Sequence, residues 1–346
     1  MKTTTKYTLV GGGIVSLFAL GIDALHQYNK IKKNPDIEFD WIEFGAFGLL
    51  GFSAGSLTGY CIGNSVEKRK IEEMNFNETK FINNILAEND ISNINPKYIK
   101  KAEQVKEILA IEYKDKLACK PNFSGSFSDG SIIKNSDIDL SLEFKPKSFS
   151  NLKQMRQDVN DKLTVSFPND KIRTQRKSEA LIFKIENKEH KIDIVPGKRI
   201  NEHSEKVSLF AKPNGFLAKP TRQQTNFNLR NSKTSGKYSE SKIIKLLKIW
   251  KENNNIPIKS YHLTLLVQKA FNENINSLPH KNVDKLLTTM EFIKNNIDKN
   301  IHAPGNTNNR ISKTLTDYDK SLIKSNLETF IKKYQKSSLA LKDLFE

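Results

Sequence analysis

The sequence has little cysteine and histidine. Cys61 and Cys119 are the only two cysteines, and the six histidines are scattered singly along 346 residues. There is no Cys-x-x-Cys pair and no Cys/His cluster with zinc spacing. These absences argue against a disulfide framework, a structural zinc and a His-based metal site, and they fit a reducing compartment.

Hydrophobic residues are also scarce, at 37% of the chain, and many of them fall within the first 65 residues. Charge is abundant: 56 basic and 39 acidic residues give a net charge of +17. Such a balance suits nucleotides, nucleic acid or an anionic membrane, but it does not choose among them. Because lysine is spread along the whole chain, a solvated surface explains the charge equally well, and nucleic acid as a partner is left open.

Two apolar segments open the chain, at residues 8–25 and 44–63. Each is long enough for a bilayer-spanning helix, which needs about 17–25 residues. A cleaved signal peptide is the alternative for the first segment. Basic residues at both ends of the pair favour cytoplasmic termini. We therefore expect residues 1–65 to form a two-helix transmembrane hairpin of a multi-pass inner-membrane protein, with the lipid bilayer as partner and the catalytic domain in the cytoplasm.

The second segment carries a four-residue ladder of glycines, which stacks them on one helix face: Gly51, Gly55, Gly59 and Gly63. Such a face lets another helix approach closely. One hypothesis is that it joins copies of the chain into a homo-oligomer. Residues 66–95 are polar and predict a short helix and a linker. Asn95-Pro96 then predicts the capped start of a helix that runs to about Leu117.

The most informative stretch is Gly125 to Phe144, GSFSDGSIIKNSDIDLSLEF. Alternating apolar residues predict a strand over 138–144, and Asp137 and Asp139, two residues apart, are expected on the same side of it. Two such carboxylates suit a pair of Mg²⁺ ions, with Mn²⁺ as a substitute. Gly125-Ser126 predicts a turn after a short strand, where backbone N–H groups and the Ser126 hydroxyl could hold a phosphate.

A third acid, Asp193, follows the alternating run ALIFKIE and a polar turn at Asn187. This pattern predicts a hairpin that carries Asp193 beside the first two acids. There it would ligate the metal at the attacking hydroxyl and take up the proton of that hydroxyl. Taken singly, each motif has a simpler interpretation: a solvated strand face, a turn or an edge-strand carboxylate. The combination is more specific than its parts.

The combination resembles the polymerase-β-like nucleotidyltransferase superfamily, and within it the CD-NTases, relatives of cyclic GMP-AMP synthase and oligoadenylate synthase. Ser124 departs from the superfamily pattern, which usually has an apolar residue there. The resemblance implies an α+β fold: a core with a mixed sheet and flanking helices at 96–205, and a C-terminal helical nucleotide-binding lobe at 206–346. Leu315 to Asp319 is expected to open a long terminal helix.

The same resemblance implies that Lys248 and Ser260 contact a triphosphate and that Tyr261 stacks on a base, with Lys245 as a second candidate for the phosphates. A solvated lysine and a core tyrosine are the simpler interpretations.

The implied function is a membrane-tethered synthase that joins ATP and other NTPs into a cyclic or short oligonucleotide messenger by two-metal catalysis, in bacterial anti-phage signalling. The alternatives are transfer to a macromolecule, as in tRNA tailing or toxin-like modification, and a non-catalytic membrane scaffold or nucleic-acid binder.

Overall fold

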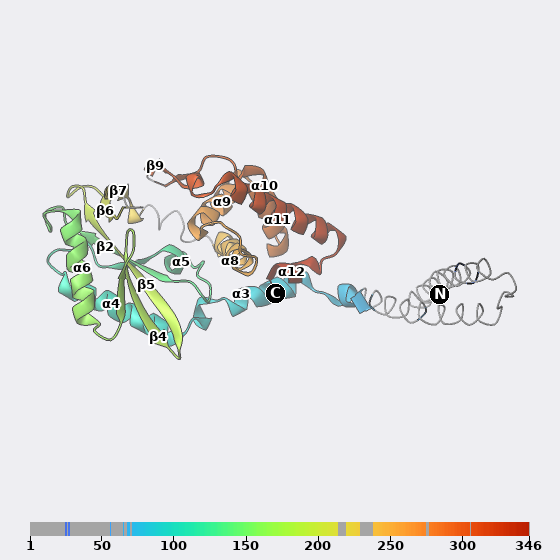
Figure 1. Ribbon diagram of the computed structural model, residues 1–346, viewed down its shortest axis with the longest axis horizontal. Coiled ribbons are helices and arrows are strands. Elements are labelled where there is room, and N and C mark those ends of the chain that lie inside the picture. The colour runs from blue at the N-terminus through green and yellow to red at the C-terminus, as the bar shows by residue number, and fades with distance from the viewer. Residues whose placement is uncertain are drawn as a thin grey trace. The chain divides into compact units, whose positions relative to one another are not determined.

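The computed structural model describes residues 71–213, 219–228, 238–274, 277–304 and 306–345, together with a few single positions before residue 71. The chain divides into two compact units, residues 1–77 with 337–339 and residues 78–336 with 340–346. All the elements discussed below lie in the second unit (Figure 1).

A seven-stranded mixed sheet organises the first half of this unit. Its main path runs β1 (Asn122–Ser124), β2 (Ile138–Phe144), β5 (Lys188–Arg199), β4 (Glu179–Ile185) and β3 (Lys171–Thr174). A side branch adds β6 (Val207–Ala211) on β5 and β7 (Thr221–Thr225) on β6. Among the strands that the structure describes, only β2 and β5 pair in parallel, and this pairing sets Asp139 opposite Asp193. The mixed sheet predicted from the sequence is confirmed.

Strand β2 forms because its apolar residues alternate and all of them can be buried on one face. Ile138, Leu140, Leu142 and Phe144 are each fully buried, in one core with the apolar faces of α4 (Pro96–Glu112) and α6 (Leu152–Ser166). Helix α4 starts where the sequence predicts, with the Asn95 side chain accepting a hydrogen bond from the Lys97 N–H. It ends at Glu112, several residues before the predicted end. The other face of β2 is left to carry polar groups.

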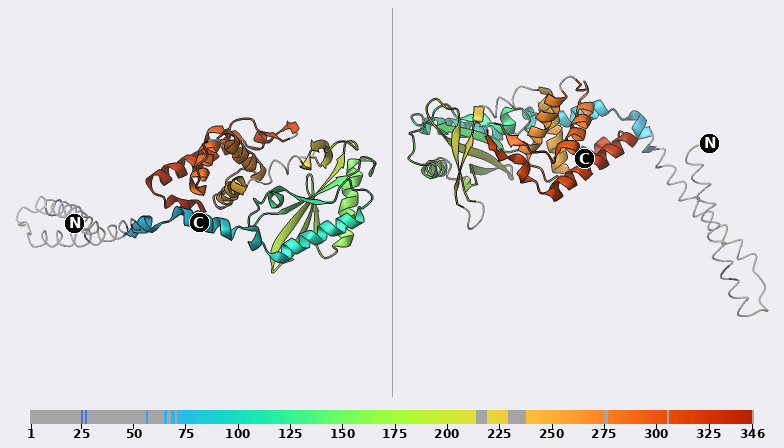
Figure 2. Two further views of the ribbon diagram at one scale, coloured as in Figure 1. Left: turned by 180° about the vertical axis from the view of Figure 1, so that it is seen from behind. Right: turned by 90° about the horizontal axis from the view of Figure 1, so that it is seen from above.

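The second half is a group of helices: α8 (Tyr238–Asn253), α9 (Ser260–Glu273), α10 (Asn282–Asn296) and α11 (Asp317–Lys336), drawn from yellow to red in Figure 2. Helix α8 contacts α9 and α10, and it is buried on every side between Ser241 and Trp250. Helix α3 (Glu78–Glu88) also packs on α8 and α10, and it lies within residues 66–95, where the sequence predicts a short helix and a linker.

The remaining elements are short and lie in the connections or at the end of the chain. They are η1 (Ile91–Asn93), α5 (Gly125–Ser128), β8 (His302–Ala303), β9 (Asn306–Arg310), η2 (Ile311–Thr314) and α12 (Ala340–Phe345). The predicted long helix α11 is therefore present, but α12 and not α11 is the last helix.

The predicted membrane location needs correction. Among the residues that the structure describes, no helix is both long and apolar enough to cross a bilayer. The longest described helix, α11, is rich in lysine and acidic residues, which a bilayer core excludes. The segments 8–25 and 44–63, on which the prediction of a transmembrane hairpin and its glycine face rested, lie outside the described residues apart from single positions.

A buried ion pair ties α6 to the turn between β3 and β4. The side chains of Arg156 and Glu179 are only 4% and 1% exposed, and Arg156 Nε lies 2.8 Å from Glu179 Oε1. The same guanidinium donates to the backbone oxygens of Arg176 at 2.9 Å, Ser178 at 2.7 Å and Gln175 at 3.0 Å. Helix α6 thereby fixes the segment that approaches Asp193.

Replacing Arg156 by methionine should destabilise the fold, because it leaves the Glu179 carboxylate buried without its cation. Breaking a buried pair in this way costs about 3–5 kcal/mol. The free energy of unfolding in urea measures the loss. Lys97→Met is the matched control, since Lys97 and Glu186 form an ion pair with both side chains 68% exposed. Equal effects of the two substitutions would contradict the role assigned to Arg156.

Candidate active site

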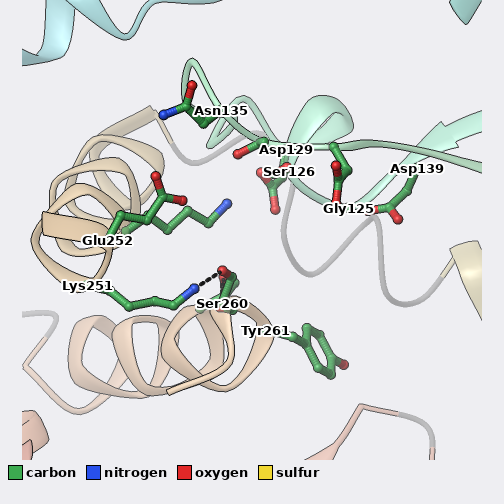
Figure 3. A pocket seen from close by; sticks show the side chains of 13 residues that line it. Gly125, Ser126, Asp129, Asn135, Asp139, Lys251, Glu252, Ser260 and Tyr261 are labelled. Carbon is green, nitrogen blue, oxygen red and sulfur yellow. Dashed lines mark hydrogen bonds between the residues drawn. The ribbon is translucent and has the colours of Figure 1, made fainter. Parts of the chain in front are cut away.

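A cavity of about 350 Å³ gathers most of the residues that the sequence singles out. From the sheet side it is lined by Gly125, Ser126, Asp129, Asn135, Ser136, Asp137 and Asp139, and from α8 and α9 by Lys248, Lys251, Glu252, Ser260, Tyr261 and Thr264. In Figure 3, Ser126 and Asp139 face Ser260 and Tyr261 across this space. Acidic and hydroxyl groups on one side thus oppose cations, hydroxyls and an aromatic ring on the other.

Gly125 is required at this turn for two separate reasons. Its φ is +63°, in the left-handed region that L side chains rarely adopt. A Cβ built on Gly125 would also lie 2.4 Å from Oδ2 of Asp139, well inside van der Waals contact. The Asp139 carboxylate therefore occupies the space that a side chain at residue 125 would fill.

Three acids lie close together where the start of β2 pairs with the middle of β5. Asp139 in β2 and Asp193 in β5 are register partners, and Asp137 precedes β2 by one residue. Asp193 is largely buried and does not line the cavity, unlike Asp137 and Asp139. The Oδ1 of Asp193 accepts a hydrogen bond from Gln175 Nε2 at 3.0 Å.

Lys191 links two of these acids. Its Nζ lies 2.7 Å from Oδ2 of Asp137 and 3.2 Å from Oδ2 of Asp193. Burial by itself would lower the pKa of Lys191, but the two carboxylates outweigh it and hold that pKa above its usual value. Burial raises the pKa of Asp193, and the Lys191 ammonium opposes that rise.

The acids offer the oxygen ligands that Mg²⁺ prefers. Among the described residues, however, no group of three His, Cys, Asp or Glu side chains is arranged to hold a metal ion. The Lys191 ammonium forms ion pairs with both Asp137 and Asp193. The donor set fits a divalent cation in its chemistry, and Asp193 can join the set only if Lys191 Nζ moves away from it.

Tyr98 of α4 joins the starts of the two acid-bearing strands. Its side chain is 3% exposed, and its hydroxyl accepts a hydrogen bond from the Ile138 N–H at 2.9 Å and donates one to the backbone oxygen of Lys191. Burial raises the pKa of Tyr98 and keeps the hydroxyl protonated. Because Ile138 lies between Asp137 and Asp139, this one hydroxyl fixes the backbone that presents all three acids.

Lys248 lines the cavity, but its ammonium contacts the protein. Its Nζ donates to the backbone oxygen of Ser131 at 2.9 Å and to Ser131 Oγ at 3.0 Å. Burial lowers the pKa of Lys248 to about 8, although the carboxylates of Asp129 and Asp139 oppose the shift. The amine stands on a helix buried on every side, so it is held in place rather than free to follow a ligand.

Lys251, one turn further along α8, was not singled out by the sequence. Its Nζ lies 3.2 Å from Oγ of Ser260, the first residue of α9, as the dashed line in Figure 3 shows. In Figure 3 the Tyr261 ring projects sideways from the next position of α9, beyond Ser260. A cation, a hydroxyl and an aromatic ring therefore follow one another along this wall.

Lys245 does not line this cavity, and its predicted role at the phosphates is not supported by its position. It lines a different cavity, together with residues of α3 and the turn at Gly130. The sequence also missed Lys191 and Lys251. Their spacing offered a signal, since Lys191 is two residues before Asp193 on one face of a strand, and Lys251 is three residues after Lys248 on one face of a helix.

Solved structures share this architecture. The Bradyrhizobium diazoefficiens CD-NTase CdnG in complex with GTP superposes with a TM-score of 0.61 at 13% identity, and the match covers 78% of this chain and 96% of that one. For E. coli MS115-1 CdnC with ATP the TM-score is 0.57 at 16% identity, and the match covers 73% of this chain and 90% of that one. For the Elizabethkingia meningoseptica CdnE cyclic dinucleotide synthase the TM-score is 0.52 at 13% identity, and the match covers 74% of this chain and 99% of that one.

The chain has the CD-NTase fold. The similarity extends through both the sheet and the helical half, because it covers about three quarters of this chain. No family profile matches the sequence, and no curated protein matches it. At this level of identity the shared fold says nothing of substrate, so activity has to be argued from the cavity.

Gly125→Ala should weaken binding of ATP in the presence of Mg²⁺ by at least about tenfold, or about 1.4 kcal/mol, because the new Cβ displaces the Asp139 carboxylate. Gly130→Ala is the matched control. Gly130 also has a positive φ, +70°, but nothing lies within 4 Å of its added Cβ. Both variants should lose about 1–2 kcal/mol of stability from the left-handed backbone. Calorimetric titration that finds equal affinities in the two variants would contradict the steric argument.

Affinity for ATP should fall above about pH 8, the pKa to which burial lowers Lys248. Only the protonated amine carries the charge that attracts phosphate, so affinity is full below that pKa and decreases as the pH rises through it. Lys248→Arg should move the decrease to higher pH, because a guanidinium stays charged. Lys251→Arg is the control and should leave the decrease in place. A flat profile between pH 7 and 10 in the wild type would exclude Lys248 from phosphate binding.

Proposed function

We propose that the chain is a metal-dependent nucleotidyltransferase that joins NTPs into a cyclic or short linear oligonucleotide. One observation carries this proposal: a single cavity combines Ser126, Asp137 and Asp139 with the cations and hydroxyl of α8 and α9. This is the pairing of functions that phosphoryl transfer requires, in which acids hold cations at the reacting phosphate and basic side chains grip the rest of the triphosphate.

Each wall of the cavity has a task under this proposal. Lys248, Lys251 and Ser260 hold the triphosphate, and Tyr261 presents its ring to the base, since stacking suits any base. The N–H groups of the turn at Gly125-Ser126 and the Ser126 hydroxyl orient the phosphate nearest to the acids. The substrate is thereby aligned before any bond forms or breaks. This alignment is the largest contribution that positioning can make to catalysis.

We propose Asp137, Asp139 and Asp193 as the ligands of two Mg²⁺ ions, with Mn²⁺ as a substitute. When bound, the ions would supply positive charge at the phosphates and lower the pKa of the attacking ribose hydroxyl. Asp193 is the candidate to accept that proton, because burial already raises its pKa. Lys191 would then turn away from Asp193 while its backbone stays tied to Tyr98.

Transfer to a macromolecule remains the second candidate. The net charge of +17 favours a polyanionic acceptor such as RNA. Four acidic residues line the same cavity, however, and they would repel a nucleic-acid backbone from that space: Asp129, Asp137, Asp139 and Glu252. We therefore favour small NTPs as both donor and acceptor.

The full chain incubated with radiolabelled ATP, GTP, CTP and UTP, singly and mixed, should give a new oligonucleotide product with Mg²⁺ or Mn²⁺ and none with EDTA. Mass spectrometry of that product identifies its bases and shows whether it is cyclic. Adding cellular RNA separates the two candidates, since label incorporated into RNA would favour transfer to a macromolecule. No metal-dependent product in any mixture would sink the enzymatic proposal.

Asp139→Asn and Asp193→Asn should each lower the rate by roughly 100-fold or more, because metal ligands supply several kcal/mol of charge stabilisation and each 1.36 kcal/mol is tenfold in rate. Asp161→Asn is the matched control, because Asp161 lies on the exposed side of α6 and accepts a hydrogen bond from Gln157 of the same helix. Circular dichroism should show that all three variants fold. Wild-type rates in both site variants would remove these acids from the mechanism.

A further inference from the structure

Lys245 is a buried cation whose charge has no close partner among the described residues. It lies in the middle of α8 and is 8% exposed. No hydrogen bond or ion pair reaches its ammonium group from the part of the chain that the structure describes. Burial lowers its pKa, and the negative charge of Asp90 opposes that shift. A buried charge of this kind is unfavourable unless a counter-charge compensates it.

The ammonium borders a cavity of about 580 Å³ between α3 and α8. Lys242, one turn earlier on α8, also lines it, with its Nζ 4.1 Å from the centre of the Tyr238 ring. Asp90 is the one acid that lines this cavity among the residues that the structure describes, and its Oδ1 accepts from the N–H and the hydroxyl of Ser92 at 3.0 and 2.9 Å. Two cations against one carboxylate leave the cavity positive.

This cavity is separate from the candidate active site but shares a turn with it. Asp129 lines the active-site cavity, and the next residue, Gly130, lines the Lys245 cavity. Two side chains of α8 hold this turn: Ser241 Oγ donates to the Asp129 backbone oxygen at 2.7 Å, and Lys248 donates to Ser131. Ser241 itself lines the Lys245 cavity.

We propose that the Lys242–Lys245 cavity is a second anion-binding site, which takes a phosphate-bearing small molecule. A lysine ammonium is a compact charge with three donors and suits phosphate oxygens. The bound anion supplies the counter-charge that Lys245 lacks.

The binding test uses the full chain in EDTA, with inorganic pyrophosphate as the probe. Lysines are acetylated with acetic anhydride, and mass spectrometry measures the rate at each residue. Pyrophosphate should slow acetylation of Lys245 and Lys242 in a saturable way, by roughly tenfold at ten times its dissociation constant. Exposed Lys162 reports nonspecific effects and should show no saturable protection. Because no turnover is needed, the result does not depend on the proposed enzymatic activity.

Two methionine variants distinguish one site from two. Lys251→Met should leave the protection of Lys245 intact, and Lys245→Met should abolish the protection of Lys242 while any protection of Lys251 remains. Loss of Lys245 protection in Lys251→Met, or undiminished protection of Lys242 in Lys245→Met, would overturn the proposal. Equal protection at Lys162 and Lys245 would overturn it as well.

Thermal unfolding provides a second measurement on the same variants. Removing an uncompensated buried charge is expected to leave the unfolding midpoint of Lys245→Met at or above that of the wild type. Pyrophosphate should raise the midpoint of the wild type and of Lys251→Met, and it should raise the midpoint of Lys245→Met by less, since only the active-site cavity can still bind the anion there. Lys245→Arg keeps the charge and should keep part of the rise. An equal rise in wild type and Lys245→Met would contradict a site at Lys245.

Discussion

Repulsion between carboxylates is the constraint around which the sheet half of this molecule is built. Parallel pairing of β2 with β5 sets Asp139 against Asp193, and Asp137 follows at the strand end. Like charges this close oppose folding unless a cation lies between them. Lys191 supplies that cation from within β5, at 2.7 and 3.2 Å from two of the acids. A divalent ion bound to the same oxygens would relieve the same repulsion, so the fold tolerates the acids with or without metal.

The rest of the core keeps these charges in place. Helix α4 contributes the Tyr98 hydroxyl, which bonds to the backbone of both strands and so resists a shift of one past the other. Helix α6 acts from the other side, because Arg156 fixes the backbone of Gln175 and the Gln175 side chain donates to Asp193. Two helices that never touch the cavity therefore decide where its acids lie. Loss of a hydrogen bond from either helix would therefore shift the acid-bearing strand segments before it disturbed the core.

Much of this sheet could be predicted from the sequence, because alternation of apolar residues has a direct physical meaning. The strand at 138–144 and the hairpin around Asn187 follow from it and are confirmed. The pairing of β2 with β5 brings residues far apart in the chain together, and no local pattern encodes it. Tertiary contacts also determine which cavity each lysine of α8 lines. This helix is buried on every side, so its sequence does not reveal that Lys248 and Lys245 face different cavities.

The fit of Asp139 against Gly125 has a further consequence for how such a turn can vary. Glycine is usually tolerant of replacement wherever a neighbouring loop can adjust its backbone. Here the obstacle is the carboxylate itself, whose Oδ2 lies 2.4 Å from where a Cβ would stand, and the backbone that carries this carboxylate is paired with β5. Alanine and serine at residue 125 should therefore displace the Asp139 carboxylate, whereas at residue 130 they should cost only the strain of the positive φ. The absence of a side chain at position 125 thus provides the space that the Asp139 carboxylate occupies.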